Sequence, residues 1–165
     1  MRAYIDSDVF VSCVMEKEKN HIKSKEFIDF ITSTNLKNDI LFFTSRFTEV
    51  EVASAVFRRS KNEDKARATL QKMERPWSNK IFPLPEKPNK RIKIDDLVIK
   101  LVETAIRYGT KFGDTVHAND VESYALEYLV TWNKKDFKVL KEKISSLKVV
   151  DPEEMLVILK ENIKN

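Results

Sequence analysis

The feature that most restricts how this chain can fold is a repeated alternation of short apolar runs with longer segments of helical periodicity. The apolar runs have the length of β-strands and occupy residues 2–6, 39–44, 80–84, 129–132 and 147–151. Segments between them, such as residues 21–35, repeat apolar side chains every three or four positions, as amphipathic helices do. Strands that alternate with helices build βαβ units, so we predict an α/β fold in three α/β/α layers with a mainly parallel central sheet.

The length of the chain fits one domain. Its 165 residues can bury a substantial core but are too few for two ordinary domains. One irregular stretch, residues 76–91, holds four of the five prolines, and it reads as a connection rather than a domain boundary. We therefore expect a single domain over residues 1–165.

Composition and charge restrict the setting and the partners. The formal net charge is +4 and the sequence pI is about 9.0, which permits a nucleic-acid partner without requiring one. Cys13 is the only cysteine, which excludes an intramolecular disulfide and zinc sites built from several cysteines. No apolar run approaches the roughly 18 residues of a membrane span, and the first residues do not resemble a signal peptide. We therefore expect a cytoplasmic protein with no membrane partner.

Three acidic residues interrupt the local patterns. Asp6 ends the first strand, Glu49 falls on the apolar stripe of its helix, and Asp114 heads another such stripe. Each has a simple structural explanation, as a helix cap or as an acid favoured in the first turn of a helix. All three nevertheless stand at helix starts that follow or could adjoin strand ends, and such ends meet at one edge of a parallel sheet.

Convergence of these acids would require a counter-charge. Two carboxylates about 4 Å apart repel by roughly 4 kcal/mol at an effective dielectric of 20, and protonation or a bound cation relieves that repulsion. Carboxylate oxygens are ligands that suit Mg²⁺ or Mn²⁺. Such ions activate water and stabilise phosphoryl oxygens, so the pattern favours metal-assisted phosphodiester hydrolysis.

Four segments, in order, resemble the motifs of the PIN-domain ribonucleases, a family that includes VapC-type toxins. YIDSDVFV is similar to the first acidic motif, and TSRFTEVEVASAV is similar to the second, a Ser or Thr followed by a Glu on an apolar helix. FGDTVHAND resembles the third motif and LVTWNKKDF the fourth. No single motif is specific, and the resemblance rests on the ordered set across residues 1–150. It implies a ribonuclease that depends on Mg²⁺ or Mn²⁺, a homodimer, and an antitoxin protein as partner if the chain is the toxin of a toxin–antitoxin pair.

The resemblance also assigns residues. Asp6, Glu49 and Asp114 match the metal-coordinating acids of the family. Asn133 departs from the pattern, because the family often has Asp at that position, although an amide can still bind a metal through its carbonyl oxygen or through water. Asp136 is an acid that could supply the missing charge. The implied catalytic set is therefore Asp6, Glu49, Asp114 and Asn133, and the implied metal set is Asp6, Glu49, Asp114 and Asp136.

Several further residues have supporting roles or purely structural explanations. Asp8 is expected to cap a helix or to support the metal ligands, and Thr131 and Ser45 to position the acids or bind phosphate. His117 is more often a packed, hydrogen-bonded residue than a catalytic base. A basic set could bind RNA phosphates, with a solvated helix face as the alternative: Arg46, Arg58, Arg59 and Lys61, to which the run KPNKRIK at 87–93 adds.

Two other functions stay open at this stage. The haloacid-dehalogenase phosphatases begin with a similar Asp-x-Asp motif, but IRYGTKF is not the apolar strand that should precede their late acidic motif, and Glu49 would have no role. A non-catalytic PIN-like module that binds RNA or protein is the second alternative, and Asn133 is the residue that supports it.

Overall fold

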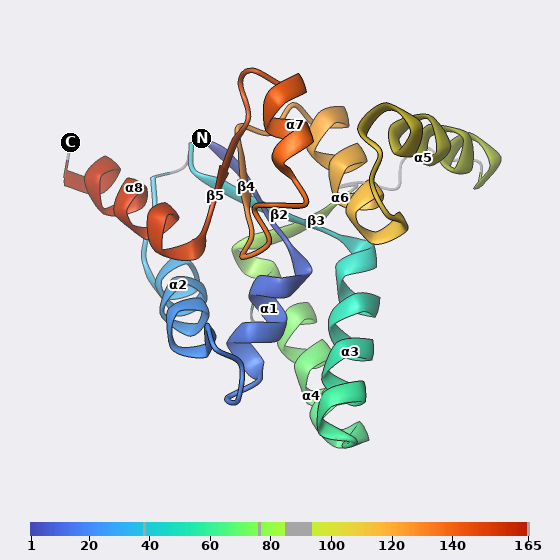
Figure 1. Ribbon diagram of the computed structural model, residues 1–165. Coiled ribbons are helices and arrows are strands. Elements are labelled where there is room, and N and C mark those ends of the chain that lie inside the picture. Colours follow the sequence, from blue (N-terminus) through green and yellow to red (C-terminus); the bar gives the residue numbers. More distant parts are fainter. Residues whose placement is uncertain (38, 76, 85–93, 165) are drawn as a thin grey trace.

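The structure, a computed structural model, describes residues 1–37, 39–75, 77–84 and 94–164 (Figure 1). A five-stranded sheet forms its centre, with the strand order β3-β2-β1-β4-β5 and every neighbouring pair parallel. The strands are β1 (Arg2–Ile5), β2 (Leu41–Ser45), β3 (Ile81–Leu84), β4 (Tyr128–Val130) and β5 (Lys148–Val150). The predicted α/β fold with a parallel sheet is confirmed.

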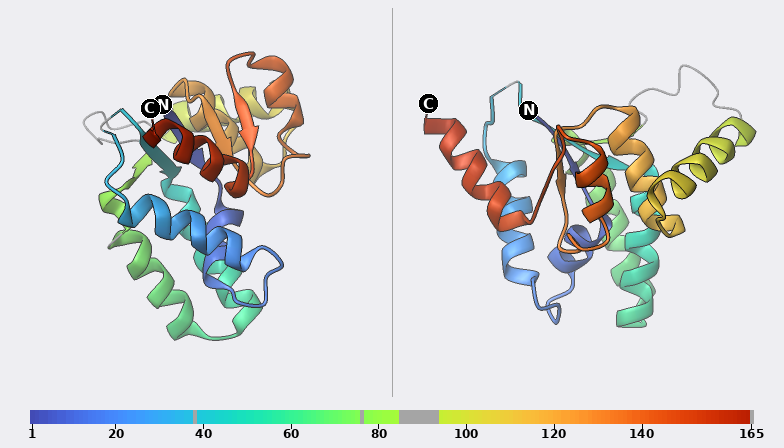
Figure 2. Two further views of the ribbon diagram at one scale, coloured as in Figure 1. Left: turned by 90° about the vertical axis from the view of Figure 1, so that its left-hand side faces the viewer. Right: turned by 45° about the horizontal axis from the view of Figure 1, so that its top comes forward.

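Helices cover both faces of this sheet (Figures 1 and 2). One face carries α1 (Ser7–Val14), α2 (His21–Ser33), α3 (Arg46–Ser60), α4 (Glu63–Glu74) and α8 (Pro152–Lys164). The other face carries α5 (Ile94–Tyr108), α6 (Phe112–Ser123) and α7 (Lys138–Lys143). A short 3-10 turn, η1 (Trp77–Asn79), precedes β3.

The central strand shows why the first apolar run of the sequence is continuous. Ala3 and Ile5 pack into the core on the α1 side, and Tyr4 packs into the core on the α6 side. All three side chains are fully buried. A strand buried on both faces cannot alternate apolar with polar residues, which is the pattern of parallel sheets covered by helices.

Local chemistry sets several helix ends. The Asn62 side chain accepts a hydrogen bond from the Lys65 backbone N–H at 2.9 Å and caps α4. Gly109 ends α5 with a φ of 65°, a left-handed conformation that glycine adopts without steric cost. Asp151 accepts a hydrogen bond from the Glu154 N–H at 2.9 Å and caps α8. The basic run at 87–93 lies outside the described residues.

The carboxyl ends of β1, β2 and β4 lie side by side and lead into the segments that carry the predicted acids. Ile5 is in register with Val130, and the Asp6 N–H donates to the Val130 carbonyl at 3.0 Å. The chain therefore leaves β1 at Asp6 directly beside Thr131, which follows β4. This edge is where open parallel sheets bind their ligands. Among the helices that the structure describes, none is long and apolar enough to cross a membrane.

Candidate active site

Asp6 is held by two side chains from other elements. It is 5% exposed at the start of α1. One carboxylate oxygen, Oδ2, accepts a hydrogen bond from the Thr131 hydroxyl at 2.7 Å. The other, Oδ1, lies 3.2 Å from Nε2 of His117 on α6. The Ser7 hydroxyl of α1 also donates to Oδ1, at 3.3 Å. The orientation of this carboxylate is therefore set jointly by the turn after β4, by α6 and by the first residue of α1.

Asp8 ties α1 to the turn after β4. Its Oδ2 accepts hydrogen bonds from the backbone N–H groups of Trp132 at 3.0 Å and Asn133 at 3.1 Å, and it lies 3.1 Å from the Thr131 hydroxyl. A hydroxyl has one proton, so Thr131 donates its hydrogen bond to Asp6, which is the nearer of the two acceptors. Burial and the nearby charge of Asp6 raise the pKa of Asp8 to about 8. Asp8 lies within the first turn of α1, whose N-cap position is Asp6, so Asp8 does not cap this helix. Its expected support of the metal ligands stays a prediction.

His117 lies between two carboxylates. Its Nε2 is 3.2 Å from Asp6 Oδ1 and 3.0 Å from Oε2 of Glu51, and its Nδ1 is 2.7 Å from the Tyr4 hydroxyl. Burial lowers the pKa of His117, but the charge of Asp6 and the ion pair with Glu51 outweigh burial and raise it to about 9. The ring is therefore an imidazolium at neutral pH, and its Nδ1–H donates to Tyr4. The expectation of a packed, hydrogen-bonded histidine agrees with this geometry.

Glu51, not Glu49, is the α3 acid that the fold places beside Asp6. Burial raises the pKa of Glu51, but the ion pair with His117 more than offsets it, so that the pKa lies below its ordinary value. The Glu51 carboxylate also lies directly against Gly113, where an added Cβ would meet Oε1 at 2.8 Å. Glu49 faces a separate cavity, described below, and touches neither Asp6 nor His117 in any recorded contact among the described residues.

The periodicity of α3 explains this correction. Its buried side chains are Thr48, Val52 and Val56, so the apolar stripe begins at Thr48 and does not include Glu49. Side chains two positions apart on an α-helix point in directions that differ by about 200°. Glu49 and Glu51 therefore flank that stripe on opposite sides. Only one of them can face β1. The sequence did contain a signal for Glu51. An apolar stripe through Thr48 and Val52 is at least as plausible as one through Glu49 and Ala53, and it makes Glu51 as good a candidate as Glu49.

Asp114, Asp136 and Asn133 form the outer part of the site. Burial raises the pKa of Asp114, and the negative charges of Asp136 and Asp6 raise it further. The side-chain amide N–H of Asn133 donates to the Asp136 carboxylate at 2.7 Å. This hydrogen bond does not use the side-chain carbonyl oxygen of Asn133. The structure thus brings Asp114 of α6 into electrostatic contact with both Asp6 and Asp136, which lies in the turn after β4.

Ser45 and Asp120 lie at the opposite margin. The Ser45 side chain accepts a hydrogen bond from the Phe47 N–H at 3.2 Å and caps α3, and Ser45 is 2% exposed. Burial raises the pKa of Asp120 to about 6, even though a bond to Ser45 and the charge of His117 lower it. Sequence reasoning missed Asp120 and Tyr4, because neither departs from the pattern of its own segment.

A groove leads from the acids along α3 towards two of the predicted RNA-binding residues. It has a volume of about 560 Å³ and runs between α1 and α3, with Asp8 and Glu51 in one part and Arg58 and Arg59 in the next turns of the helix. Arg59 pairs with Glu18 across the groove at 3.0 Å. Arg46 lies at the start of α3, and Lys61 follows its last turn with a φ of 55°.

The chemistry of the donor set fits a hard divalent cation. All the donors are oxygens, and Asp8 Oδ1 is buried with no hydrogen-bond partner among the described residues. Burial raises the pKa of Asp114, and the charges of Asp136 and Asp6 raise it further, although His117 and Lys111 lower it. Across the described ranges no three His, Cys, Asp or Glu side chains are close enough to enclose an ion. An ion that keeps several waters and takes one or two carboxylates, as Mg²⁺ does, needs no such cage.

A parallel sheet in this order, with acids where β1 ends and where α6 begins, is the fold of the PIN-domain proteins. Among solved structures the chain is similar to three such proteins. PAE2754 of Pyrobaculum aerophilum has 17% identity and a TM-score of 0.60 over 98% of this chain and 96% of that one. VapBC2 of Rickettsia felis, bound to a DNA fragment from its promoter, has 12% identity and a TM-score of 0.58 over 92% and 98%. VapC20 of Mycobacterium tuberculosis, a toxin that cleaves the sarcin–ricin loop, has 13% identity and a TM-score of 0.55 over 77% and 86%.

These likenesses show a shared fold. No protein-family model matches the sequence, and no curated protein matches it. The resemblance drawn from the four motifs is therefore confirmed at the level of the PIN fold.

Proposed function

We propose that this protein is a metal-dependent endoribonuclease of the VapC type, whose active site is the acid cluster at the carboxyl ends of β1 and β4. The observation that carries the proposal is the meeting of Asp6, Glu51 and Asp114 from three separate elements around one buried centre. Burial of several acids in one place destabilises a fold unless a cation compensates their charge. Such clusters are typical of functional sites. The shared fold with toxins of this type supports the same function.

The proposed ion is Mg²⁺ or Mn²⁺, held by Asp6 and Asp114, with Asp136 and the Asn133 carbonyl oxygen at the outer side. When bound, such an ion supplies an activated water and neutralises charge on a phosphate oxygen. The protein's own residues do the rest. Thr131 and His117 fix the two oxygens of Asp6, and Asp8 fixes the turn that presents Asn133. Arg58 and Arg59 line the groove and would bind the phosphates of an RNA that enters it.

Metal removal tests the proposal. We expect RNA cleavage to stop after EDTA treatment and dialysis, and to return with added Mn²⁺ or Mg²⁺. We also expect the melting temperature to rise with the metal, because an ion that binds only the folded state at 100 times its Kd contributes about 2.7 kcal/mol. For a chain of this size that is about 5–10 °C. A metal-independent melting temperature together with no cleavage would favour the non-catalytic binding module.

We further propose that the protein forms a homodimer through α5. This helix extends away from the rest of the molecule (Figure 2) and carries a continuous row of exposed apolar side chains, Ile94, Val98, Ile99, Val102 and Ile106. Its first turn is acidic, with Asp95 and Asp96, and its last turn is basic, with Arg107. An antiparallel pair of α5 helices would bury both apolar rows and place the acidic end of each beside the basic end of the other. A twofold axis produces this kind of self-complementary contact.

The dimer is tested by placing a charge in the apolar row. We expect Val98→Glu to convert a dimer into a monomer in size-exclusion chromatography with light scattering, because a buried carboxylate facing its own copy is strongly unfavourable. Val157→Glu on α8 is the matched control, since Val157 is 56% exposed and Val98 is 51% exposed. A monomeric wild type, or a dimer that survives Val98→Glu but not Val157→Glu, would contradict the proposal. An antitoxin partner is proposed only with the toxin function, by analogy with the VapBC proteins.

A further inference from the structure

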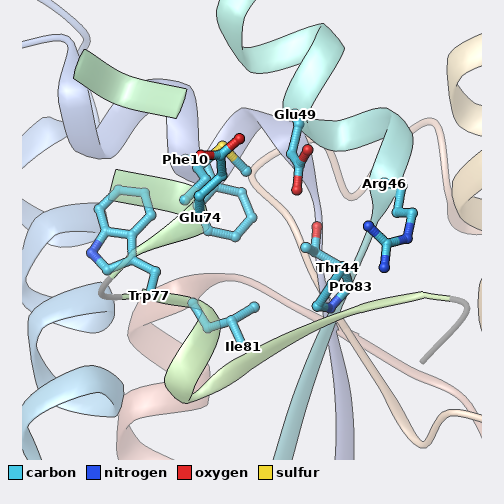
Figure 3. Close-up of a pocket in the computed structure, with 9 residues that line it drawn as sticks. Phe10, Thr44, Arg46, Glu49, Glu74, Trp77, Ile81 and Pro83 are labelled. Carbon is cyan, nitrogen blue, oxygen red and sulfur yellow. The ribbon is translucent and has the colours of Figure 1, made fainter. Parts of the chain in front are cut away.

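A second cavity lies beside the acid cluster and shares α1 and α3 with it. It has a volume of about 210 Å³ and opens between the start of α3, the end of α4 and β3 (Figure 3). The Thr44 hydroxyl in its wall donates to the Ile5 carbonyl at 3.0 Å, so the cavity adjoins the residue that precedes Asp6. Nothing in the proposed cleavage chemistry uses this cavity.

The walls of the cavity differ in chemistry from side to side. Trp77 and Phe10 form an aromatic wall, with ring centroids 5.7 Å apart and planes tilted by 32°. Met73, Ile81 and Pro83 continue it as an apolar surface. Across from Trp77, Glu49 and Arg46 project from the first turn of α3 (Figure 3). Among the described residues, neither Glu49 nor Arg46 has a recorded hydrogen bond or ion pair through its side chain. Glu74 also lines the cavity, and it already has an interaction partner. The cavity therefore offers one occupant an aromatic and apolar wall, the carboxylate of Glu49 and the guanidinium of Arg46.

We propose that this cavity binds an unstacked guanine of the RNA, with its phosphate against Arg46; the proposal rests on the ribonuclease function. Single-stranded RNA is recognised by stacking its bases on aromatic side chains and by hydrogen bonds to their Watson–Crick edges. The guanine edge presents an imino and an amino donor side by side, which match the two oxygens of the Glu49 carboxylate. Adenine and cytosine present one amino donor at that edge, and uracil presents one imino donor.

The presence of both charges favours a nucleotide over a peptide side chain. An arginine from a protein partner would gain from Glu49 and Trp77 but would be repelled by Arg46. A nucleotide combines an aromatic base, hydrogen-bond donors and a negative phosphate. It can therefore pack on the aromatic wall, donate to Glu49 and pair with Arg46. Glu49 is thus the residue that selects the base. It lies on the opposite side of the buried α3 stripe from Glu51, which belongs to the acid cluster.

The test measures nucleotide binding without cleavage. The fluorescence of Trp77 reports the cavity once the other tryptophan is removed by Trp132→Phe. In that background we expect guanosine 5′-monophosphate to quench Trp77 at least about 10-fold more tightly than uridine 5′-monophosphate. Glu49→Gln should weaken the guanosine nucleotide about 10-fold or more, the usual effect of losing a hydrogen bond to a charged group. It should leave the uridine nucleotide unchanged. Glu161→Gln, at an exposed position of α8, is the matched control and should change neither.

Four outcomes would overturn the proposal. Three of them are equal binding of the two nucleotides, guanosine binding that Glu49→Gln does not weaken, and quenching by N-acetyl-argininamide in the absence of quenching by either nucleotide. The last of these would assign the cavity to a cationic side chain of a protein partner. RNA cleavage with no guanosine binding would overturn the cavity proposal alone. Guanosine binding without cleavage would leave the cavity as a nucleotide site and overturn the ribonuclease function.

Discussion

Asp6→Asn is expected to abolish RNA cleavage. The Asp6 carboxylate is the centre of the site, because Thr131 and His117 hold its two oxygens in place. Changes to residues that merely support a metal ligand cost about 10–100-fold in affinity or activity, so loss of a ligand should cost at least about 100-fold in kcat/KM. Single-turnover cleavage of a labelled RNA in saturating Mn²⁺ measures this loss. The exposed Asp64→Asn on α4 is the matched control and should retain full activity.

The same variant has a defined effect on stability in the absence of metal. Repulsion among the acids alone would make Asp6→Asn more stable than the wild type. The structure predicts the opposite sign, because Asp6 is the main source of the raised pKa of His117 and accepts the Thr131 hydrogen bond. We expect a loss of about 1–3 kcal/mol in urea unfolding, the usual effect of deleting a buried charged hydrogen-bond partner. A gain in stability would mean that repulsion dominates and that His117 does not compensate it.

His117→Gln is expected to be the most destabilising of the variants considered. His117 is 2% exposed and is the cation that faces Asp6 and Glu51, and its ring also bonds Tyr4. Removing one partner of a buried ion pair typically costs about 3–5 kcal/mol, and glutamine cannot carry the charge. Urea unfolding at pH 6 measures the loss. His21→Gln is the natural control, since His21 is the only other histidine and contacts a backbone carbonyl near the surface.

The pH dependence of stability separates the charge of His117 from its packing. The folded-state pKa, about 9, lies above the ordinary value of 6.5, so its contribution is fully present below pH 6.5 and is lost as pH rises through 9. This difference corresponds to about 3 kcal/mol. The raised pKa of Asp8, about 8, also makes stability fall with rising pH, but this effect persists in His117→Gln.

The stability difference between wild type and His117→Gln should therefore be largest near pH 6 and small above pH 9. A difference that stays constant across this range would show that His117 acts through shape alone. Wild type and His21→Gln should follow parallel curves throughout.

Much of the architecture was open to prediction from the sequence. The continuous apolar runs of β1 and β2, the helical stripes and the caps at Asn62, Gly109 and Asp151 all express local rules. Apolar periodicity reports which faces must be buried, and capping residues report where a helix must end. Asp6 was also recognisable, since a carboxylate at the end of a fully buried strand breaks its own pattern.

The choice between Glu49 and Glu51 was beyond such rules. Both acids lie near the start of α3 and both interrupt an apolar segment. The apolar stripe can be drawn through Glu49 and Ala53 or through Thr48 and Val52, and only the second choice, which is the buried one, leaves Glu49 and Glu51 on opposite sides of it. Which stripe is buried depends on how α3 packs against α1 and α4, which is a contact between distant parts of the chain. Tyr4 and Asp120 were invisible for the same reason, because their importance comes from a shared neighbour, His117, and from no local irregularity.

The sequence alone determined the order of elements, the parallel α/β class and the presence of acids at the carboxyl ends of the strands, because these depend on periodicities within about ten residues. The tertiary structure decided which acid joins Asp6, that an internal imidazolium stands between them, and that Glu49 faces an aromatic cavity instead. These outcomes depend on the rotation of each helix about its axis, and that rotation is set by packing against elements that no local pattern can locate.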